Sequence, residues 1–430
     1  MNHINHTTVR GAFVIEGGKK LSGEISVRGS KNATTPILAA TLLTDKPCIV
    51  DNIPRIEDVF VMLDLLIDLG SKVEWLNDHC VRIHNDAIDI SHLSDDRVKK
   101  IRSSILLMGA LSARFDEFSI AHPGGCVIGS RPVGTHFDAL RGLGVSLRQE
   151  GGKYVIHAHE RHPAVIVLKE FSVTATENAM MLAAALPGKT VIKIAAAEPH
   201  VEDLGNFLTK MGAQISGLGT HTLTIKGKKR ALLSGVEHTV INDANEAATF
   251  LILGAAGRGD IFVSGAREDH LDLVLERLRQ FGVSLEVNDQ GIRVFPGKRN
   301  LRAVGKLDAR IYPGIPTDVQ APFGVLATQA IGETLIHDTL FEGRFNYIGE
   351  LQKMGANAHI LNPHQALIIG KTPLLGTTIY SYDLRSGAAL IIAALIAKGT
   401  TVVQDAYQVD RGYEKIEERL RGIGAVIERQ

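Results

Sequence analysis

The chain has 430 residues, and at this length two or more domains are expected rather than a single hydrophobic core. Its 47 lysines and arginines balance 47 aspartates and glutamates, which argues against a surface that coats nucleic acid or membrane but leaves room for a local basic pocket. No apolar run is long enough to span a bilayer, the N-terminus lacks a signal-peptide core, and three cysteines are too few for a disulfide framework, so we expect a cytoplasmic protein with free thiols.

Glycine is in excess, and the excess follows a pattern. Six times along the chain, a stretch with helical periodicity ends in an apolar residue and a glycine, and a short alternating strand follows. A glycine at this point ends a helix in the left-handed conformation at no steric cost. Six matches at spacings of 68 to 74 residues indicate an internal repeat. In chain order the glycines are Gly70, Gly144, Gly212, Gly282, Gly355 and Gly424.

Several repeats show a second helix upstream, rich in small residues, at 177–186, 247–256 and 388–397. One repeat therefore reads strand, helix, strand, loop, helix, strand, and six repeats suggest two domains of three. Because these upstream helices are apolar nearly all round, we expect them to lie buried inside each domain.

The loops ahead of the repeat helices are where chemistry is expected, because loops on a rigid scaffold carry function. Arg131, Arg344 and Arg411 lie 13, 11 and 13 residues before their repeat glycines, so their positions are nearly equivalent. If such loops gather at one end of each domain, their arginines and nearby helix N-termini would form an anion site. A single arginine is more often a solvated surface residue, and the recurrence makes the two interpretations about equal.

Cys126 lies in a glycine-rich loop with Arg131 nearby. The glycines allow the loop to expose the thiol, and positive charge lowers a thiol pKa and favours the reactive thiolate. Cys48 and Cys80 have no such setting and are typical of inert, small apolar residues.

Two other segments are polar where structure alone does not require it. Residues 28–36 hold Lys31 and Asn32, and residues 312–323 hold Asp318. For each segment taken alone, a helix cap or a solvated lysine is the favoured interpretation. The sequence has no Walker-type phosphate loop, no dinucleotide fingerprint and no zinc-ligand spacing, so a metal or cofactor has little support.

Taken together, segments along almost the whole chain resemble the UDP-N-acetylglucosamine enolpyruvyltransferase (1-carboxyvinyltransferase) family. The match runs in order from Phe13 to Arg429, and its cysteine loop and its DRGYEK segment are specific motifs. The matching segments are GSKNATTPILAATLL, HPGGCVIGSRPVGTHFDALRGLG, SVTATENAMMLAAAL, YPGIPTDVQAPF, LFEGRFNYIGELQKMGA, DLRSGAAL and VDRGYEKIEERLRGIGA.

The resemblance implies an α/β fold of two inside-out α/β barrels, each made of three repeated units, in agreement with the six glycines. It implies a discontinuous first domain of residues 1–31 and 243–430, and a second domain of residues 32–242 that carries the Cys126 loop.

The resemblance also implies a reaction. The enolpyruvyl group of phosphoenolpyruvate moves to the 3-hydroxyl of UDP-N-acetylglucosamine by addition and elimination, and phosphate is released. This is the first committed step of peptidoglycan precursor synthesis, and the thiol-alkylating compound fosfomycin inhibits the family. We expect these two small substrates and no cofactor, no nucleic acid, no membrane and no obligate protein partner.

Site residues are carried over position by position. Cys126 matches the acid that protonates C3 of phosphoenolpyruvate, Asp318 matches the carboxylate that accepts the hydroxyl proton, and Asp383 is expected to assist proton transfer. The implied phosphoenolpyruvate contacts are Lys31, Asn32, Arg131, Arg385 and Arg411, of which Lys31 and Arg411 are also expected to act in catalysis. The implied nucleotide-sugar contacts are Arg102, Arg131, Pro132, Val133, Gly134, Thr135, Ser172, Val173, Thr174, Asp318, Leu340 and Arg344.

Three positions depart from the family pattern. Thr174 stands where the family normally has glycine, and Gly134 and Thr135 replace the commoner residues. Because these departures fall among the nucleotide contacts, the alternative is a related enolpyruvyl transferase that acts on another uridine nucleotide. A non-catalytic nucleotide-sugar-binding relative is less favoured, since the expected acid and base are retained. The shikimate-pathway synthase shares the fold, but its lysine motif differs and it has no cysteine loop.

Overall fold

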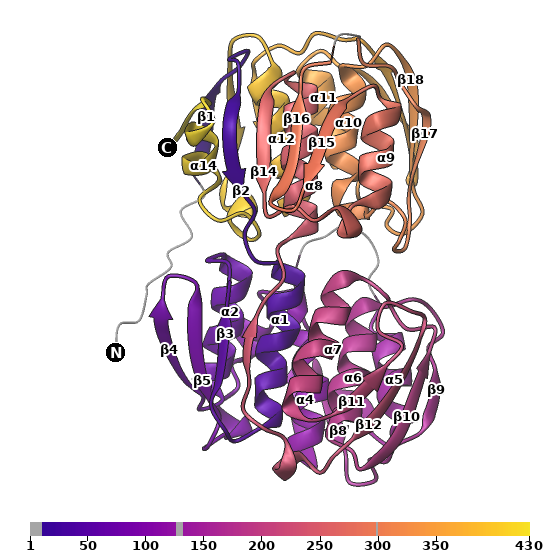
Figure 1. The fold of residues 1–430 in the computed structure, drawn as a ribbon. Helices are drawn as coiled ribbons and strands as arrows, with labels where there is room; N and C mark the ends of the chain where they lie inside the picture. Colours follow the sequence, from indigo (N-terminus) through magenta and orange to yellow (C-terminus); the bar gives the residue numbers. More distant parts are fainter. Residues whose placement is uncertain (1–10, 126–131, 298–299) are drawn as a thin grey trace. The chain divides into compact units, whose positions relative to one another are not determined.

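The computed structural model describes residues 11–125, 132–297 and 300–430 (Figure 1). These residues form two compact units: the first unit contains residues 11–27 and 243–430, and the second unit contains the rest. The chain leaves the first unit after Val27, four residues earlier than the boundary that the resemblance implied. Lys31 therefore begins a helix of the second unit.

In the first unit, three helices lie inside and three four-stranded sheets lie outside them (Figure 1). The inner helices α8 (Ala244–Ala256), α10 (Gln320–Thr328) and α12 (Leu384–Ile396) contact one another, and each packs on its own sheet. Nearly all their residues are buried, which confirms the prediction made from their apolar sequences. In sheet order the strands are β21 (Thr378–Tyr380), β22 (Thr400–Gln404), β1 (Ala12–Glu16) and β23 (Val426–Arg429); β15 (Ser284–Asn288), β16 (Gly291–Phe295), β14 (Asp260–Ser264) and β2 (Ser22–Ser26); and β17 (Gly305–Ala309), β18 (Gly332–Asp338), β20 (Gln365–Gly370) and β19 (Asn357–Asn362).

The second unit repeats this plan with a separate hydrophobic core. Its inner helices are α1 (Lys31–Ala40), α4 (Leu107–Arg114) and α6 (Val173–Ala184), and α4 contacts both of the others. In sheet order the strands are β13 (Glu237–Thr239), β3 (Cys48–Asp51), β5 (Cys80–His84) and β4 (Lys72–Asn77); β6 (Glu117–Ala121), β8 (Lys153–His157) and β7 (Ser146–Glu150); and β11 (Gln214–Ser216), β12 (Thr222–Gly227), β10 (Gly188–Lys193) and β9 (Val165–Val167).

The repeat helices are the second helices of the six sequence repeats, and each is followed by the glycine of its repeat. All six glycines have positive φ angles, from 81° at Gly144 to 113° at Gly212, which confirms the left-handed helix ends predicted from the sequence. The repeat helices are α2 (Glu57–Asp68), α5 (Gly134–Gly142), α7 (Pro199–Met211), α9 (Asp272–Gln280), α11 (Asn346–Lys353) and α14 (Ile416–Gly422). The remaining short helices are α3 (Asp95–Val98), α13 (Tyr407–Asp410) and the 3₁₀ turns η1 (Thr41–Leu43), η2 (Ile90–His92), η3 (Arg102–Leu106), η4 (Arg230–Leu232), η5 (Glu268–His270) and η6 (Thr317–Val319).

The sixth repeat is completed by the other end of the chain. Strand β1 lies between β22 and β23 and is antiparallel to both, so Phe13 is opposite Val403 on one side and Arg429 on the other. Phe13 is fully buried, and the guanidinium of Arg429 lies 4.6 Å from its ring centroid. The first and last strands therefore close the first unit together.

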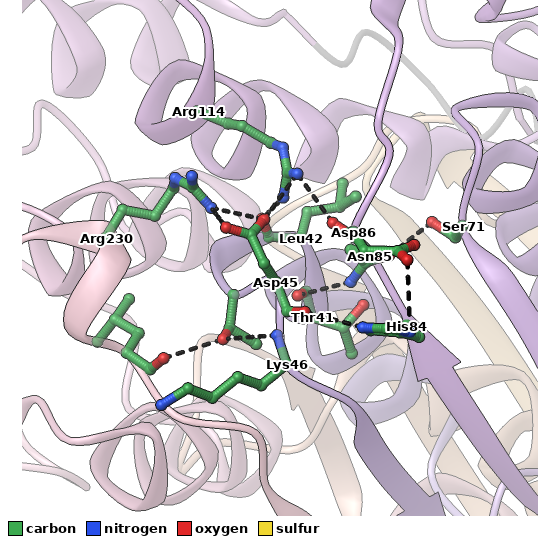
Figure 2. A network of polar contacts seen from close by, with 12 residues as sticks. Thr41, Leu42, Asp45, Lys46, Ser71, His84, Asn85, Asp86, Arg114 and Arg230 are labelled. Atoms are coloured by element: carbon green, nitrogen blue, oxygen red, sulfur yellow. Dashed lines mark hydrogen bonds and ion pairs between the residues drawn. The ribbon is translucent and has the colours of Figure 1, made fainter.

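A network of polar contacts fixes the C-terminal end of α1 (Figure 2). The Asp45 carboxylate accepts hydrogen bonds from Arg230 at 3.0 and 3.1 Å, and Arg114 lies 2.8 Å from the same carboxylate. Arg114 also donates to the carbonyl of Asn85, whose side-chain amide donates to the carbonyl of Thr41. Because α1 begins at Lys31, this structural network lies at the end of the helix away from the predicted site residue.

Within the described residues, no helix is long and apolar enough to cross a membrane. The same residues contain no group of three or more histidine, cysteine, aspartate or glutamate side chains that could hold a metal ion. Cys48 and Cys80 are both buried, and burial raises the pKa of the Cys48 thiol to about 11. A thiol with this pKa remains protonated at neutral pH, in agreement with the inert role expected for it.

Candidate active site

In the first unit, Asp318 lies between two arginines. Its Oδ1 accepts a hydrogen bond from Nη2 of Arg344 at 2.8 Å, and its Oδ2 accepts one from Nε of Arg385 at 2.9 Å. The arginine side chains are 8% and 4% exposed, and that of Asp318 is 21% exposed. Neither η6 nor α10 has a side-chain cap, so Asp318 is not the helix cap that the sequence alone favoured.

The inner helices of the first unit meet at this cluster. Arg385 is in the first turn of α12, and its Nη1 lies 3.4 Å from the hydroxyl of Tyr413. That hydroxyl is also 2.9 Å from Oγ1 of Thr249 on α8, while Asp318 lies in η6, the turn that leads into α10. Burial alone would lower the pKa of Arg385, but the negative charge of Asp318 raises it above its ordinary value. Arg385 therefore stays protonated, and its positive charge favours the ionised form of Asp318.

Asp338, at the end of β18, supports the neighbouring backbone. Its carboxylate accepts hydrogen bonds from the backbone N–H groups of Leu340, at 2.9 Å, and Phe341, at 3.1 Å, and it also contacts the hydroxyl of Thr317. Asp338 is fully buried. It therefore links the expected nucleotide-sugar contact Leu340 to the turn that carries Asp318, a role that the sequence analysis missed.

The Asp383 carboxylate contacts the start of an inner helix. Its Oδ1 accepts from the backbone N–H groups of Arg385 and Ser386 at 2.9 and 3.1 Å, and its Oδ2 accepts from the Ser386 hydroxyl at 2.7 Å. These contacts form a capping box at the start of α12. Both carboxylate oxygens therefore contact the start of α12, next to Arg385, and the expected part of Asp383 in proton transfer stays a prediction. Arg411 is half-buried at the end of α13, two residues before Tyr413.

In the second unit, Lys31 forms an ion pair. Its Nζ lies 2.7 Å from Oδ2 of Asp58, in the first turn of α2, and the two side chains are 17% and 4% exposed. The cap of α1 is Ser30, whose hydroxyl accepts from the backbone N–H of Ala33 at 3.3 Å. Lys31 is thus neither a cap nor a solvated lysine, and Asn32 follows it, half-buried, in the same helical turn. An acidic residue at the start of a helix is common, which is why Asp58 carried no signal in the sequence.

The glycines before Cys126 pack closely on the segment that contains Arg102. A Cβ atom on Gly124 would lie 1.6 Å from the carbonyl oxygen of Lys99, and one on Gly125 would lie 2.9 Å from Cβ of Arg102. Burial lowers the pKa of Arg102, and the phenol oxygen of Tyr154 partly offsets this effect. Both glycines are therefore required by close backbone contact. Cys126 and Arg131 lie outside the described residues.

The expected nucleotide-sugar contacts of the second unit lie at the starts of two helices that pack together. Pro132 and Val133 directly precede α5, which begins with Gly134 and Thr135. The other segment begins α6: the Ser172 hydroxyl caps this helix, and Val173 and Thr174 form its first turn. The structure therefore brings the two segments of the second unit together. It places Arg344, Leu340 and Asp318 in the first unit.

Two units with helices enclosed by sheets, one holding a carboxylate between arginines and the other a paired lysine, suit an enzyme that handles anionic substrates. The EPSP synthase (3-phosphoshikimate 1-carboxyvinyltransferase) family matches residues 15–420, and the chain belongs to this family of enolpyruvyl transferases.

Within this family, the chain is similar over its full length to relatives that carry one enzyme name. The UDP-N-acetylglucosamine 1-carboxyvinyltransferase of Methylacidiphilum infernorum is 43% identical over 97% of this chain and 98% of its own length. A protein named UDP-N-acetylglucosamine 1-carboxyvinyltransferase 1, from Carboxydothermus hydrogenoformans, is 41% identical with the same coverage.

Solved structures agree on the fold. The enolpyruvyl transferase NikO from Streptomyces tendae superposes with a TM-score of 0.88 at 25% identity, over 98% of this chain and 99% of its own. EPSP synthase from Acinetobacter baumannii gives a TM-score of 0.73 at 20% identity, over 98% of this chain and 100% of its own. The expected fold of two inside-out α/β barrels is confirmed.

Proposed function

We propose that this enzyme transfers the enolpyruvyl group of phosphoenolpyruvate to the 3-hydroxyl of UDP-N-acetylglucosamine, with release of phosphate. The names and the full-length similarity of the relatives support this pair of substrates. The observation that carries the proposal is the Asp318 carboxylate held between Arg344 and Arg385, because the reaction needs a group that accepts the hydroxyl proton.

Asp318 suits that task for an electrostatic reason. Two arginines favour its ionised form, and an ionised carboxylate can accept both a hydrogen bond and a proton. A sugar hydroxyl that donates to this carboxylate would be oriented for attack and would lose its proton to it. Asp383 caps α12 and so holds Arg385, and hence Asp318, in place.

The remaining roles follow the resemblance. A proton from Cys126 is added to C3 of phosphoenolpyruvate, which makes C2 electrophilic, and the sugar oxygen forms a bond to C2. The tetrahedral intermediate then loses a C3 proton and phosphate, which restores the double bond. Lys31, Arg131 and Arg411 would balance the charge of the phosphate as it leaves, with Asn32 as a further substrate contact.

Arg385 would also meet the carboxylate of phosphoenolpyruvate, and the helix starts at Gly134 and Ser172 would bind the nucleotide sugar together with Arg102. We further propose that the reaction takes place in the cytoplasm, where both substrates occur, and supplies peptidoglycan precursor synthesis. No resident cofactor takes part in the proposed steps.

The test is phosphate release from phosphoenolpyruvate by the purified full chain. We expect release only when UDP-N-acetylglucosamine is added, and a product whose mass exceeds that of the acceptor by one enolpyruvyl group. Release with another uridine nucleotide but none with this acceptor would overturn the substrate assignment.

A second measurement addresses the acid. Fosfomycin is expected to label Cys126, and peptide mass analysis will show which cysteine carries the label. Label on Cys48 or Cys80 instead would contradict the role given to Cys126.

A further inference from the structure

Two side-chain hydrogen bonds connect the start of α5 to the segment that leads into α6. Oγ1 of Thr135 donates to Oε1 of Glu170 at 2.5 Å, and Nε2 of His136 lies 2.7 Å from Oγ1 of Thr174. These residues come from different repeats, and the two bonds flank the helix starts expected to bind the nucleotide sugar. We call this pair of bonds the α5–α6 clasp.

Two of the clasp residues are positions where the sequence departs from the family pattern. The resemblance implies a glycine at the position of Thr174 and another residue type at the position of Thr135, and a glycine could make no side-chain hydrogen bond. Each hydroxyl is engaged by a side chain of the protein itself. The departures therefore supply bonds between the two segments, and they do not require a different ligand to explain them.

Both bonds of the clasp are partly buried. Thr135 is 7% exposed and His136 is 3% exposed, whereas Thr174 is half-buried and Glu170 is exposed. A hydrogen bond with one partner out of water contributes more than a bond between two exposed side chains. A third contact joins the same elements, between Nζ of Lys169 and Oδ2 of Asp138 at 2.8 Å, but there the lysine side chain is 74% exposed. Exposed pairs of this kind contribute little.

We propose that Thr174 and Thr135 are positioning residues for the acceptor: through the clasp they hold the starts of α5 and α6 in the arrangement that binds UDP-N-acetylglucosamine. This inference rests on the proposed function. Preorganising the two segments lowers the cost of ordering them when the acceptor binds, and so raises affinity without any new contact to the ligand.

The test uses the full chain and substitutions that remove only the hydroxyl. Thr174→Val and Thr135→Val keep the shape of the side chain, and Thr174→Ser restores the hydroxyl. We expect each valine variant to weaken UDP-N-acetylglucosamine binding about two- to tenfold, measured by calorimetry and as KM, because one hydrogen bond is lost. The KM for phosphoenolpyruvate should stay unchanged, and Thr174→Ser should recover the affinity of the unmodified protein.

Lys169→Met is the matched control, because it removes the exposed contact between the same elements and should leave acceptor binding unchanged. Lower melting temperatures for both valine variants with unaltered acceptor affinity would overturn the proposal, since a merely structural bond behaves in that way. Binding that is equally weakened by Lys169→Met would also overturn it. If the unmodified protein binds UDP-N-acetylglucosamine but releases no phosphate, the proposed function is refuted. The role of the clasp is then decided by the acceptor affinities of the valine variants alone. An unmodified protein that does not bind this acceptor would refute both.

Discussion

The ion pair between Lys31 and Asp58 allows catalysis and folding to be separated. In Lys31→Met, the ammonium that lies 2.7 Å from the Asp58 carboxylate is lost, and that carboxylate is 4% exposed. Removing one partner of a buried ion pair costs about 3–5 kcal/mol, because the other charge stays in a poorly solvated place. Since Lys31 is itself 17% exposed, we expect about 3 kcal/mol. A solvated lysine would cost less than about 0.5 kcal/mol.

The assay is a double-mutant cycle read by urea unfolding and by phosphate release. Asp58→Asn in the Lys31→Met background removes the charge that the first substitution leaves behind, so most of the lost free energy of unfolding should return. Phosphate release should stay low in both, because the cation that would balance the phosphate is absent in each. Stability and activity should therefore respond differently to the second substitution.

Two results would refute this reasoning. If Lys31→Met unfolds at the same urea concentration as the unmodified protein, the ion pair does not contribute to stability. If the double variant regains phosphate release together with stability, Lys31 acts only in folding and has no part in handling phosphate.

Two further predictions concern the fold. Gly282 has a φ of +86°, and among the described residues the nearest atom to a Cβ there is 3.8 Å away, so Gly282→Ala should lower the free energy of unfolding in urea by about 1–2 kcal/mol, from left-handed strain alone. Gly70→Ala should cost more, because its Cβ would lie 2.4 Å from the carbonyl oxygen of Ala87. Burial raises the pKa of Glu417, but the hydrogen bond from Arg429 at 2.7 Å outweighs it and holds that pKa below its ordinary value of 4.5. Because the Glu417 pKa is lower in the folded protein, ionised Glu417 stabilises the fold at pH values above 4.5, and this stability is lost as the pH falls through the folded pKa. In Arg429→Met the free energy of unfolding should therefore fall less steeply as the pH is lowered. An unchanged pH profile of the free energy of unfolding would contradict this prediction.

The repeat was predictable from the sequence because its signal is local. A left-handed helix end constrains one residue, glycine meets that constraint best, and six glycines at regular spacing therefore revealed six units. The closing role of β1 was not predictable in the same way. Its partners β22 and β23 lie at the other end of the chain, and nothing in a five-residue alternating segment specifies which strands it joins.

For the candidate site too, the sequence could predict the residues that lie in local motifs but not those whose roles depend on distant contacts. The family motifs named Asp318 and Lys31, but the sequence could not name Asp58, Asp338 or Tyr413, because their roles depend on contacts between separate elements. An acidic residue early in a helix, or at the end of a strand, looks the same in the sequence whether it supports a site or faces water. Only the fold shows which of them is buried against a functional side chain.

Asp318 shows why position within a repeat is a weaker guide than chemistry. The recurrence of arginines ahead of the repeat helices singled out Arg344 and Arg411, yet Asp318 is bound by Arg344 and by Arg385, which belongs to an inner helix. The recurrence describes positions in the loops alone, so it could not name a partner that lies in the first turn of an inner helix. Which arginines contact Asp318 depends on how the loop and the inner helices pack together, and the fold shows this packing whereas the repeat pattern does not.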